Sequence, residues 1–168
     1  MKGGPKKTLS SPIKAVLVVG TTPDYVAKIY EKRPGSVVFL IDHHFEGDPH
    51  FNGIPPSALL FVALDDIEET YRRTTLFLSA NDISPEGTAC FDCESLITSS
   101  RLASRLQNIF PPWQAIARSR NKFAAGRLWS SAGVASSAAI LASDTVRTLD
   151  FLDSHREGIV LAGLRERE

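Results

Sequence analysis

Short apolar segments alternate with polar ones along the first half of the chain. Residues 15–19 are apolar at every position, which is typical of a strand buried on both faces in a parallel sheet. Similar runs at 37–41 and 57–64 predict two more strands, and a fourth is expected at 88–91 after a loop at 81–87. A helical segment lies between the first two runs, and a strand, a helix and a strand in this space form a βαβ unit. The pattern therefore predicts an α/β fold with a Rossmann-like parallel sheet.

The segments between these strands carry helix signals. A helix is expected to begin at Pro23, where proline suits the first helical position, and to bury Tyr25 and Val26. Asp65-Asp66 is expected to cap a second helix. Within it, residues 74–79 are ambiguous, because their β-branched and aromatic side chains would also suit a strand.

Two further helices are expected in the second half of the chain. One begins at about Ser95, is expected to bury Ile109, and ends at Pro111-Pro112. The other begins near Lys122 and is expected to end at Gly133, where helices often finish on a left-handed residue. Its apolar stripe has the spacing i, i+3, i+4, i+7 and consists of Ala125, Leu128, Trp129 and Ala132.

Composition and charge narrow the function classes. The 168 residues suffice for one domain with a real core or for one and a half small ones, and 43% hydrophobic with 23% charged residues is ordinary for a soluble globular protein. Lys+Arg and Asp+Glu both number 19, so no global basic field is present to bind nucleic acid or an anionic membrane. The N-terminal segment lacks the apolar core of a signal peptide, and no apolar run approaches the length of a membrane span. These features predict a cytoplasmic protein.

The ends of the first two predicted strands carry candidate binding residues. Gly20 follows the first strand, but a dinucleotide-binding loop needs three glycines, so a tight turn is favoured. After the second strand, three histidines and three acids lie within nine positions, at the end of a parallel strand where α/β sheets bind ligands. The favoured interpretation of this segment is a polar, solvated loop. Its members are Asp42, His43, His44, Glu46, Asp48 and His50.

The histidine segment also allows a metal site. Asp42-His43-His44 resembles the motif of the DHH phosphoesterases, which hold manganese for phosphodiester cleavage. This resemblance covers three residues and implies a metal-dependent phosphoesterase as an alternative function, with His50 as a further ligand.

The only two cysteines, Cys90 and Cys93, have the CxxC spacing. They are too few for a disulfide framework, which suits a reducing compartment. A zinc site would need two further ligands, and the chain contains no second CxxC and no HxxxH. A redox pair would lie at a helix N-terminus, which the expected helix from Ser95 allows. Two half-buried reduced thiols are the favoured interpretation.

From residue 90 onward the order of motifs becomes specific. A strand ending in Cys90-Phe91-Asp92-Cys93 leads to a long helix and a proline-bounded loop. Arg120-Asn121-Lys122 then opens a helix that ends in Ala132-Gly133-Val134. This order resembles the ATP-grasp superfamily, particularly its carboxylate–amine ligase-like branch, in which a Rossmann-like domain leads into a half-domain that opens with Arg-Asp-Lys. The remaining elements expected on this pattern are a strand at 138–141, a helix at 146–152 and a strand at 158–161.

The resemblance implies an enzyme that uses ATP and Mg²⁺ to activate a small-molecule carboxylate as an acyl phosphate, which an amine then attacks. Lys122 matches the family's first lysine for the ATP phosphates, although its neighbour is Asn121 where the family has aspartate. The second phosphate lysine should follow Leu161, where this chain has Ala162-Gly163. The glycine-rich loop and the acidic magnesium ligands belong beyond that point. The resemblance thus implies an N-terminal fragment that is inactive alone and binds ATP weakly or not at all.

On this reading the chain consists of a flexible tail at 1–13, a Rossmann-like pre-ATP-grasp domain at 14–111, and a partial ATP-grasp half-domain at 112–168. No catalytic residue is assigned to it. Because the half-domain lacks its usual partner half, self-association of the chain is expected. A non-catalytic binding or interaction module on the same fold is the alternative to a ligase.

Overall fold

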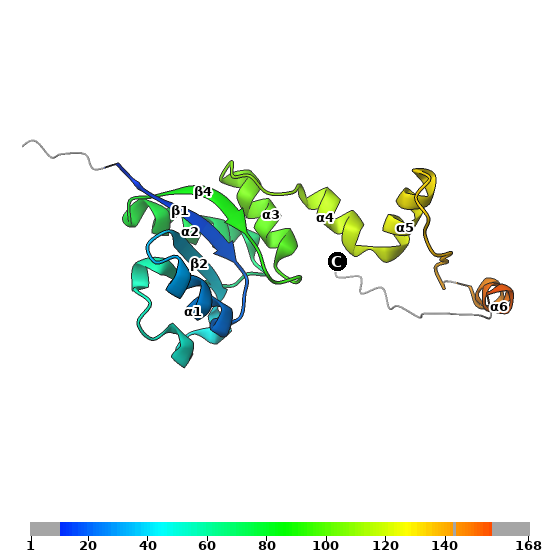
Figure 1. Ribbon diagram of the computed structural model, residues 1–168, viewed down its shortest axis with the longest axis horizontal. Helices are drawn as coiled ribbons and strands as arrows, with labels where there is room; N and C mark the ends of the chain where they lie inside the picture. Colours follow the sequence, from blue (N-terminus) through cyan, green and yellow to red (C-terminus); the bar gives the residue numbers. More distant parts are fainter. Residues whose placement is uncertain (1–10, 143, 156–168) are drawn as a thin grey trace, which may run out of the picture. The chain divides into compact units, whose positions relative to one another are not determined.

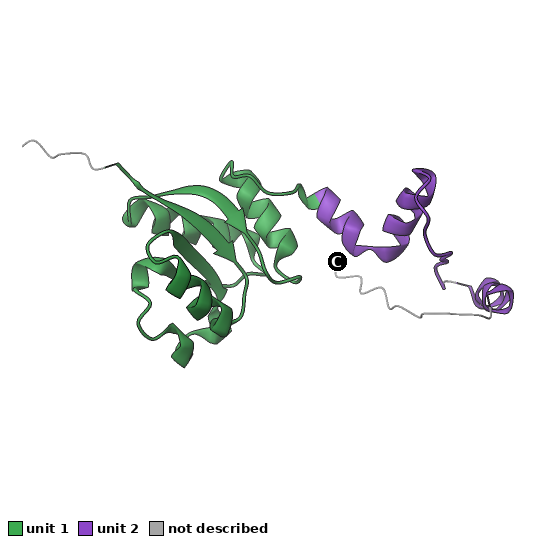
Figure 2. Ribbon diagram, viewed as in Figure 1, with its two compact units in different colours: residues 1–113 green, residues 114–168 purple. Residues whose placement is uncertain are grey.

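The computed structural model describes residues 11–142 and 144–155. The chain divides into two compact units, residues 1–113 and residues 114–168, called unit 1 and unit 2 (Figure 2). Residues 1–10 of the expected tail lie outside the described part. None of the described helices is long and apolar enough to cross a membrane.

Unit 1 is built on a four-stranded parallel sheet with the strand order β3-β2-β1-β4 (Figure 1). This confirms the predicted α/β fold. Three single-turn 3₁₀ helices lie between β2 and β3, including the histidine segment. The elements in chain order are β1 (Ile13–Val19), α1 (Pro23–Lys32), β2 (Val37–Asp42), η1 (His43–Phe45), η2 (Pro49–Phe51), η3 (Pro56–Ala58), β3 (Leu59–Val62), α2 (Ile67–Ala80), β4 (Ile83–Ala89) and α3 (Leu96–Arg105).

Apolar layers cover both faces of the sheet. Leu17 of β1 packs in one cluster with Leu78 of α2 and Leu102 of α3, and all three are buried. The neighbouring Val18 lies in a second cluster with Val26 of α1. Because successive side chains of a strand point to opposite faces, α2 and α3 cover one face and α1 covers the other. This arrangement explains why the strands are apolar at every position.

The helices α1 and α2 of unit 1 form where the sequence predicts them, but one side chain that was predicted to be buried is exposed. Val26 of α1 is fully buried, but Tyr25 is 53% exposed, so its predicted burial was wrong. Tyr25 stands one position off the inward face, and the Lys28 Nζ lies 5.1 Å from its ring centroid. α2 continues as helix through the ambiguous residues 74–79, where Thr74 and Leu78 point into the core.

β4 differs most from its sequence expectation. It begins at Ile83, so the expected loop at 81–87 was wrong. Pro85 and Gly87 disfavour a strand, but β4 pairs with β1 alone, and proline is tolerated on an edge strand. The pairing passes from Pro85 directly to Gly87, which leaves Glu86 as an extra, bulged residue. The carboxylate of Glu86 forms an ion pair with the Lys14 Nζ at 2.8 Å.

α3 ends at Arg105, well before Pro111. Gln107 has a φ of +56° and takes the left-handed position that usually holds glycine at a helix end. The N–H of Asn108 then bonds back to the carbonyl of Ala103 at 2.8 Å. The chain leaves the helix here, so Ile109 is 88% exposed, and its predicted burial was wrong.

Three helices follow among the described residues from Trp113 onward. They are α4 (Trp113–Arg120), whose first residue is the last of unit 1, and α5 (Lys122–Ser131) and α6 (Thr145–Ser154) in unit 2. α4 occupies the segment that was expected to be a loop, because proline marks helix starts as well as loops and Trp113 directly follows Pro112. α6 confirms the helix expected at 146–152. Within 134–142 the structure has no strand, so the expectation of one at 138–141 was wrong. The strand expected at 158–161 lies outside the described residues.

α5 ends as predicted at Gly133, whose φ is +73°. The N–H of Gly133 bonds to the carbonyl of Ser130, and that of Val134 bonds to Trp129, which together form a Schellman cap. Of the predicted apolar stripe only Ala125 is buried. Leu128 and Trp129 are 55% and 53% exposed, so most of this stripe is uncovered in the described chain.

Candidate functional site

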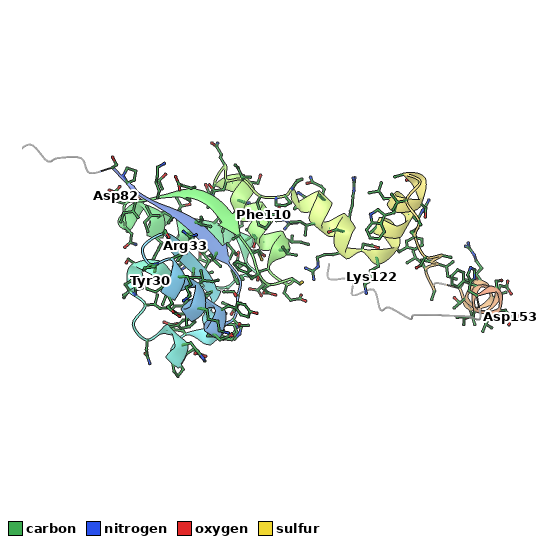
Figure 3. All side chains as sticks on the ribbon, viewed as in Figure 1. Tyr30, Arg33, Asp82, Phe110, Lys122 and Asp153 are labelled. Atoms are coloured by element: carbon green, nitrogen blue, oxygen red, sulfur yellow. The ribbon has the colours of Figure 1, made fainter. Side chains whose placement is uncertain are left out.

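Lys122 is the first residue of α5 (Figure 3). Asn121 caps this helix, because its side-chain oxygen accepts the N–H of Ala124 at 2.9 Å. The Lys122 side chain is exposed. The first turn of a helix carries partial positive charge, which a lysine there adds to, so the position is electrostatically favourable for an anion such as phosphate.

The surroundings of Lys122 are more basic than the whole chain. Residues 114–142 contain no Asp or Glu, whereas the protein as a whole is neutral. Sequence reasoning from net charge missed this local excess, which a charge count by segment would have found. The four basic residues of this segment are Arg118, Arg120, Lys122 and Arg127.

Unit 2 also contains an open cavity of about 490 Å³, which the sequence analysis did not anticipate. Arg127 is its only charged lining residue, and the Arg127 Cζ lies 5.9 Å from the ring centroid of Phe123. The hydroxyl oxygens of Ser130 and Ser136 are 2.5 Å apart on its wall. The lining residues are Phe123, Gly126, Arg127, Ser130, Ser136, Ser137, Ala138, Ala139 and Phe151.

The first part of the histidine segment folds around Asp42 at the end of β2. One Asp42 oxygen, Oδ1, accepts the backbone N–H of His44 at 3.1 Å and lies 2.6 Å from its ring Nδ1. The His43 Nδ1 lies 3.3 Å from the same oxygen. Burial works to raise the pKa of Asp42, but the hydrogen bonds from His44 and the charges of both histidines lower that pKa overall. Asp42 thus acts as the cap of the 3₁₀ helix η1.

The second part repeats the same motif with different residues. The Asp48 Oδ1 accepts the N–H of His50 at 2.9 Å and lies 2.8 Å from its Nδ1. Asp42 thus contacts His43 and His44, whereas Asp48 contacts His50, and the structure does not gather Asp42, His43, His44 and His50 around one metal position. In the described residues, no group of three or more His, Cys, Asp or Glu side chains could hold a metal ion. This holds for manganese at the histidine segment and also for magnesium near Lys122.

Gly20 does not form a phosphate cradle. Its φ is +67°, and a Cβ added there would lie 2.1 Å from the Ser95 Oγ and 3.3 Å from the Asp92 Oδ2. The space inside the turn is therefore occupied by a hydroxyl and by a carboxylate, which would repel a phosphate. The turn after β1 is tight, as predicted, and it also lets β1 pack closely against the start of α3.

The two cysteines lie in the same region, between the end of β4 and the start of α3. Cys90 is half-buried and Cys93 is exposed. Both are thiols in the structure.

No protein-family model and no curated protein sequence matches this chain. Its structure is similar to the crystal structure of an L-amino acid ligase from Bacillus licheniformis, with a TM-score of 0.56 and 14% sequence identity. The match covers 75% of this chain and 32% of the ligase chain, so this chain spans about a third of that protein's length. At this identity the likeness shows a shared fold alone, which agrees with the α/β fold that the sequence predicts.

Proposed function

We propose that this chain is the N-terminal part of an ATP-dependent ligase that joins a small-molecule carboxylate to an amine. The observation that carries the proposal is the fold likeness to an L-amino acid ligase over 75% of the chain. The order of motifs around Lys122 points to the same class of enzyme independently, because it was read from the sequence alone.

In this proposal Lys122 contacts a phosphate of ATP from the N-terminus of α5. Its exposed ammonium, the first turn of the helix and the absence of acidic residues in 114–142 all suit a phosphate. The described residues do not suit magnesium, since they provide no acidic cluster that could hold it. The second phosphate lysine, the glycine-rich loop and the magnesium ligands must come from other segments. We therefore derive no catalytic step from this chain, and expect it to be inactive alone.

The test compares this chain with a version extended by the coding sequence that follows Glu168. We expect the extended protein to release ADP from ATP when amino acid mixtures are supplied, and this chain to release none. Lys122→Ala should lower that release about a hundredfold, as the loss of a preorganised charge contact does in other enzymes. Arg118→Ala is the matched control, because it removes an exposed positive charge from the neighbouring helix α4 and should leave the rate nearly unchanged.

Two results would contradict the proposal. The downstream sequence could lack an in-frame glycine-rich loop followed by paired acids, or the extended protein could release no ADP with any amino acid mixture. Either result would leave a non-catalytic binding module on the same fold as the better account.

A further inference from the structure

The CxxC segment lies in the loop between the last residue of β4, Ala89, and the first residue of α3, Leu96. The strand order β3-β2-β1-β4 places this loop beside the end of β1. This is a topological switch point, because β2 and β3 lie on one side of β1 and β4 lies on the other. That position in a parallel α/β sheet is where ligands and reactive groups commonly lie. The proposed ligase function uses neither cysteine, so their chemistry is a separate question.

The side chain of Cys90 lies close to the backbone of Cys93. The Cys90 Sγ donates a hydrogen bond to the backbone carbonyl oxygen of Asp92 at 3.0 Å. No cis peptide bond occurs among the described residues, and in a trans peptide this oxygen is about 3 Å from the Cα of the next residue, Cys93. The Cys90 Sγ thus lies within about 6 Å of the Cys93 Cα, which places the two residues near the separation that a disulfide needs.

The loop is held in this conformation by contacts that do not involve sulfur. The Asp92 Oδ1 accepts the N–H of Glu94 at 2.9 Å, and the Oδ2 accepts the hydroxyl of Ser95 at 2.8 Å. Ser95 is buried at the start of α3. Oxidation of the cysteines would therefore replace the Cys90 hydrogen bond without removing the anchors of the loop.

The environments of the two thiols differ in a way that sets the order of reaction. Burial raises the pKa of the Cys90 thiol, and the nearby charges of Asp92 and Cys93 raise it further, against the lowering effect of hydrogen bonds with Ser99 and the Asp92 backbone. The thiolate is the reactive form, so the half-buried Cys90 is the poorer initial nucleophile. The exposed Cys93 is accessible to a small molecule from solvent.

We propose that Cys90 and Cys93 form a reversible dithiol–disulfide site that exchanges with low-molecular-weight disulfides such as oxidised glutathione. The Cys93 thiolate attacks one sulfur of glutathione disulfide, forms a mixed disulfide and releases one glutathione thiolate. Cys90 loses its proton to solvent, and its thiolate attacks the Cys93 sulfur and displaces the second glutathione. The net reaction converts a protein dithiol and one glutathione disulfide into a protein disulfide and two glutathiones.

The test equilibrates the full chain with mixtures of reduced and oxidised glutathione, quenches with acid, alkylates the remaining thiols and measures intact mass. We expect the wild-type chain to lose both thiols together, to carry no glutathione, and to regain both thiols with dithiothreitol. Cys90→Ser and Cys90→Ala should each keep one glutathione on Cys93, because the resolving thiol is missing. In Cys93→Ser, the remaining thiol of Cys90 should stay unmodified in the same mixtures. Circular dichroism identifies which variants are folded, and the wild-type result stands without them.

Three outcomes would overturn the proposal. The wild-type chain could remain a dithiol even in oxidised glutathione alone, or it could accumulate a stable glutathione adduct on Cys93. It could also form a disulfide between two chains, visible as a dimer on a non-reducing gel. None of these outcomes bears on ADP release by the extended protein, so this inference and the proposed function fail separately.

Discussion

The contact between Gly20 and Ser95 predicts a large effect of one added methyl group. In Gly20→Ala the new Cβ would lie 2.1 Å from the Oγ and 2.3 Å from the Cβ of Ser95. Rotating the Ser95 side chain moves its Oγ but leaves its Cβ in place, so either β1 or the start of α3 must shift by more than 1 Å to restore van der Waals contact, for which carbon atoms need about 3.5 Å. Ser95 is buried, so its side chain cannot move out into solvent to make room for the added methyl group.

The magnitude follows from two unfavourable effects and one favourable one. A side chain at the Gly20 φ of +67° costs about 1–2 kcal/mol of folding free energy. Overpacking adds about 1–3 kcal/mol, and the less flexible unfolded chain returns about 0.4–1 kcal/mol. We therefore expect Gly20→Ala to lower the free energy of unfolding by about 3 kcal/mol, and the Tm by roughly 12–24 °C for a unit of this size.

Urea unfolding followed by far-UV circular dichroism measures this loss, and two controls separate its causes. Gly35 has a φ of +74° with nothing within 4 Å of an added Cβ, so Gly35→Ala should cost only about 1 kcal/mol. In a Ser95→Gly background both contacting atoms are gone, and Gly20→Ala should likewise cost about 1 kcal/mol. The expected coupling between the two sites is thus about 2 kcal/mol. The reasoning fails if Gly20→Ala costs no more than Gly35→Ala.

Three further predictions concern the candidate sites. Millimolar Mg-ATP should not raise the Tm of this chain by the roughly 3–6 °C that a competent, well-saturated site would give, and Lys122→Ala should behave like wild type in the same thermal scan. Replacing the exposed His43 and His44 by alanine should change the free energy of unfolding by no more than about 0.5 kcal/mol, whereas a manganese-dependent rise in Tm that these changes abolish would restore the phosphoesterase hypothesis. Because Leu128 and Trp129 are exposed on α5, the chain should self-associate in sedimentation experiments in a concentration-dependent way, and Trp129→Ser should weaken the association; a sharp monomer at all concentrations would contradict this.

The strands at the centre of the sheet could be predicted from the sequence because burial on both faces leaves an unambiguous signature. β1 and β2 each have neighbours on both sides and helices on both faces, which requires apolar residues at consecutive positions. β4 has only one neighbour, so it tolerates Pro85 and Gly87, and its sequence looks like a loop. The sequence therefore did not predict the full extent of this edge strand, because an edge position does not require the apolar pattern of a central strand.

The ends and exposures of the helices were less predictable, because they depend on local backbone geometry and on partners. The residue type of Gln107 does not predict its left-handed conformation, which ends α3 early. In α5 the apolar stripe is present in the sequence, but a stripe is buried only where another element covers it. Leu128 and Trp129 have the correct spacing and remain exposed, because spacing specifies a face and not its partner.

The position of the candidate phosphate contact was predictable, but its electrostatic setting was hidden by the neutral net charge. Between residues 95 and 143 the sequence has six basic residues and no acid, and the balancing acids lie elsewhere. One of the six, Arg105, is neutralised in unit 1 by an ion pair with Glu68 at 2.7 Å. The four on α4 and α5, which include Lys122, are exposed to solvent, where each contact contributes at most about 1 kcal/mol and salt screens it beyond about 8 Å. Such a field favours anions over cations without fixing one in place. A binding site requires, in addition, donors that converge on the phosphate.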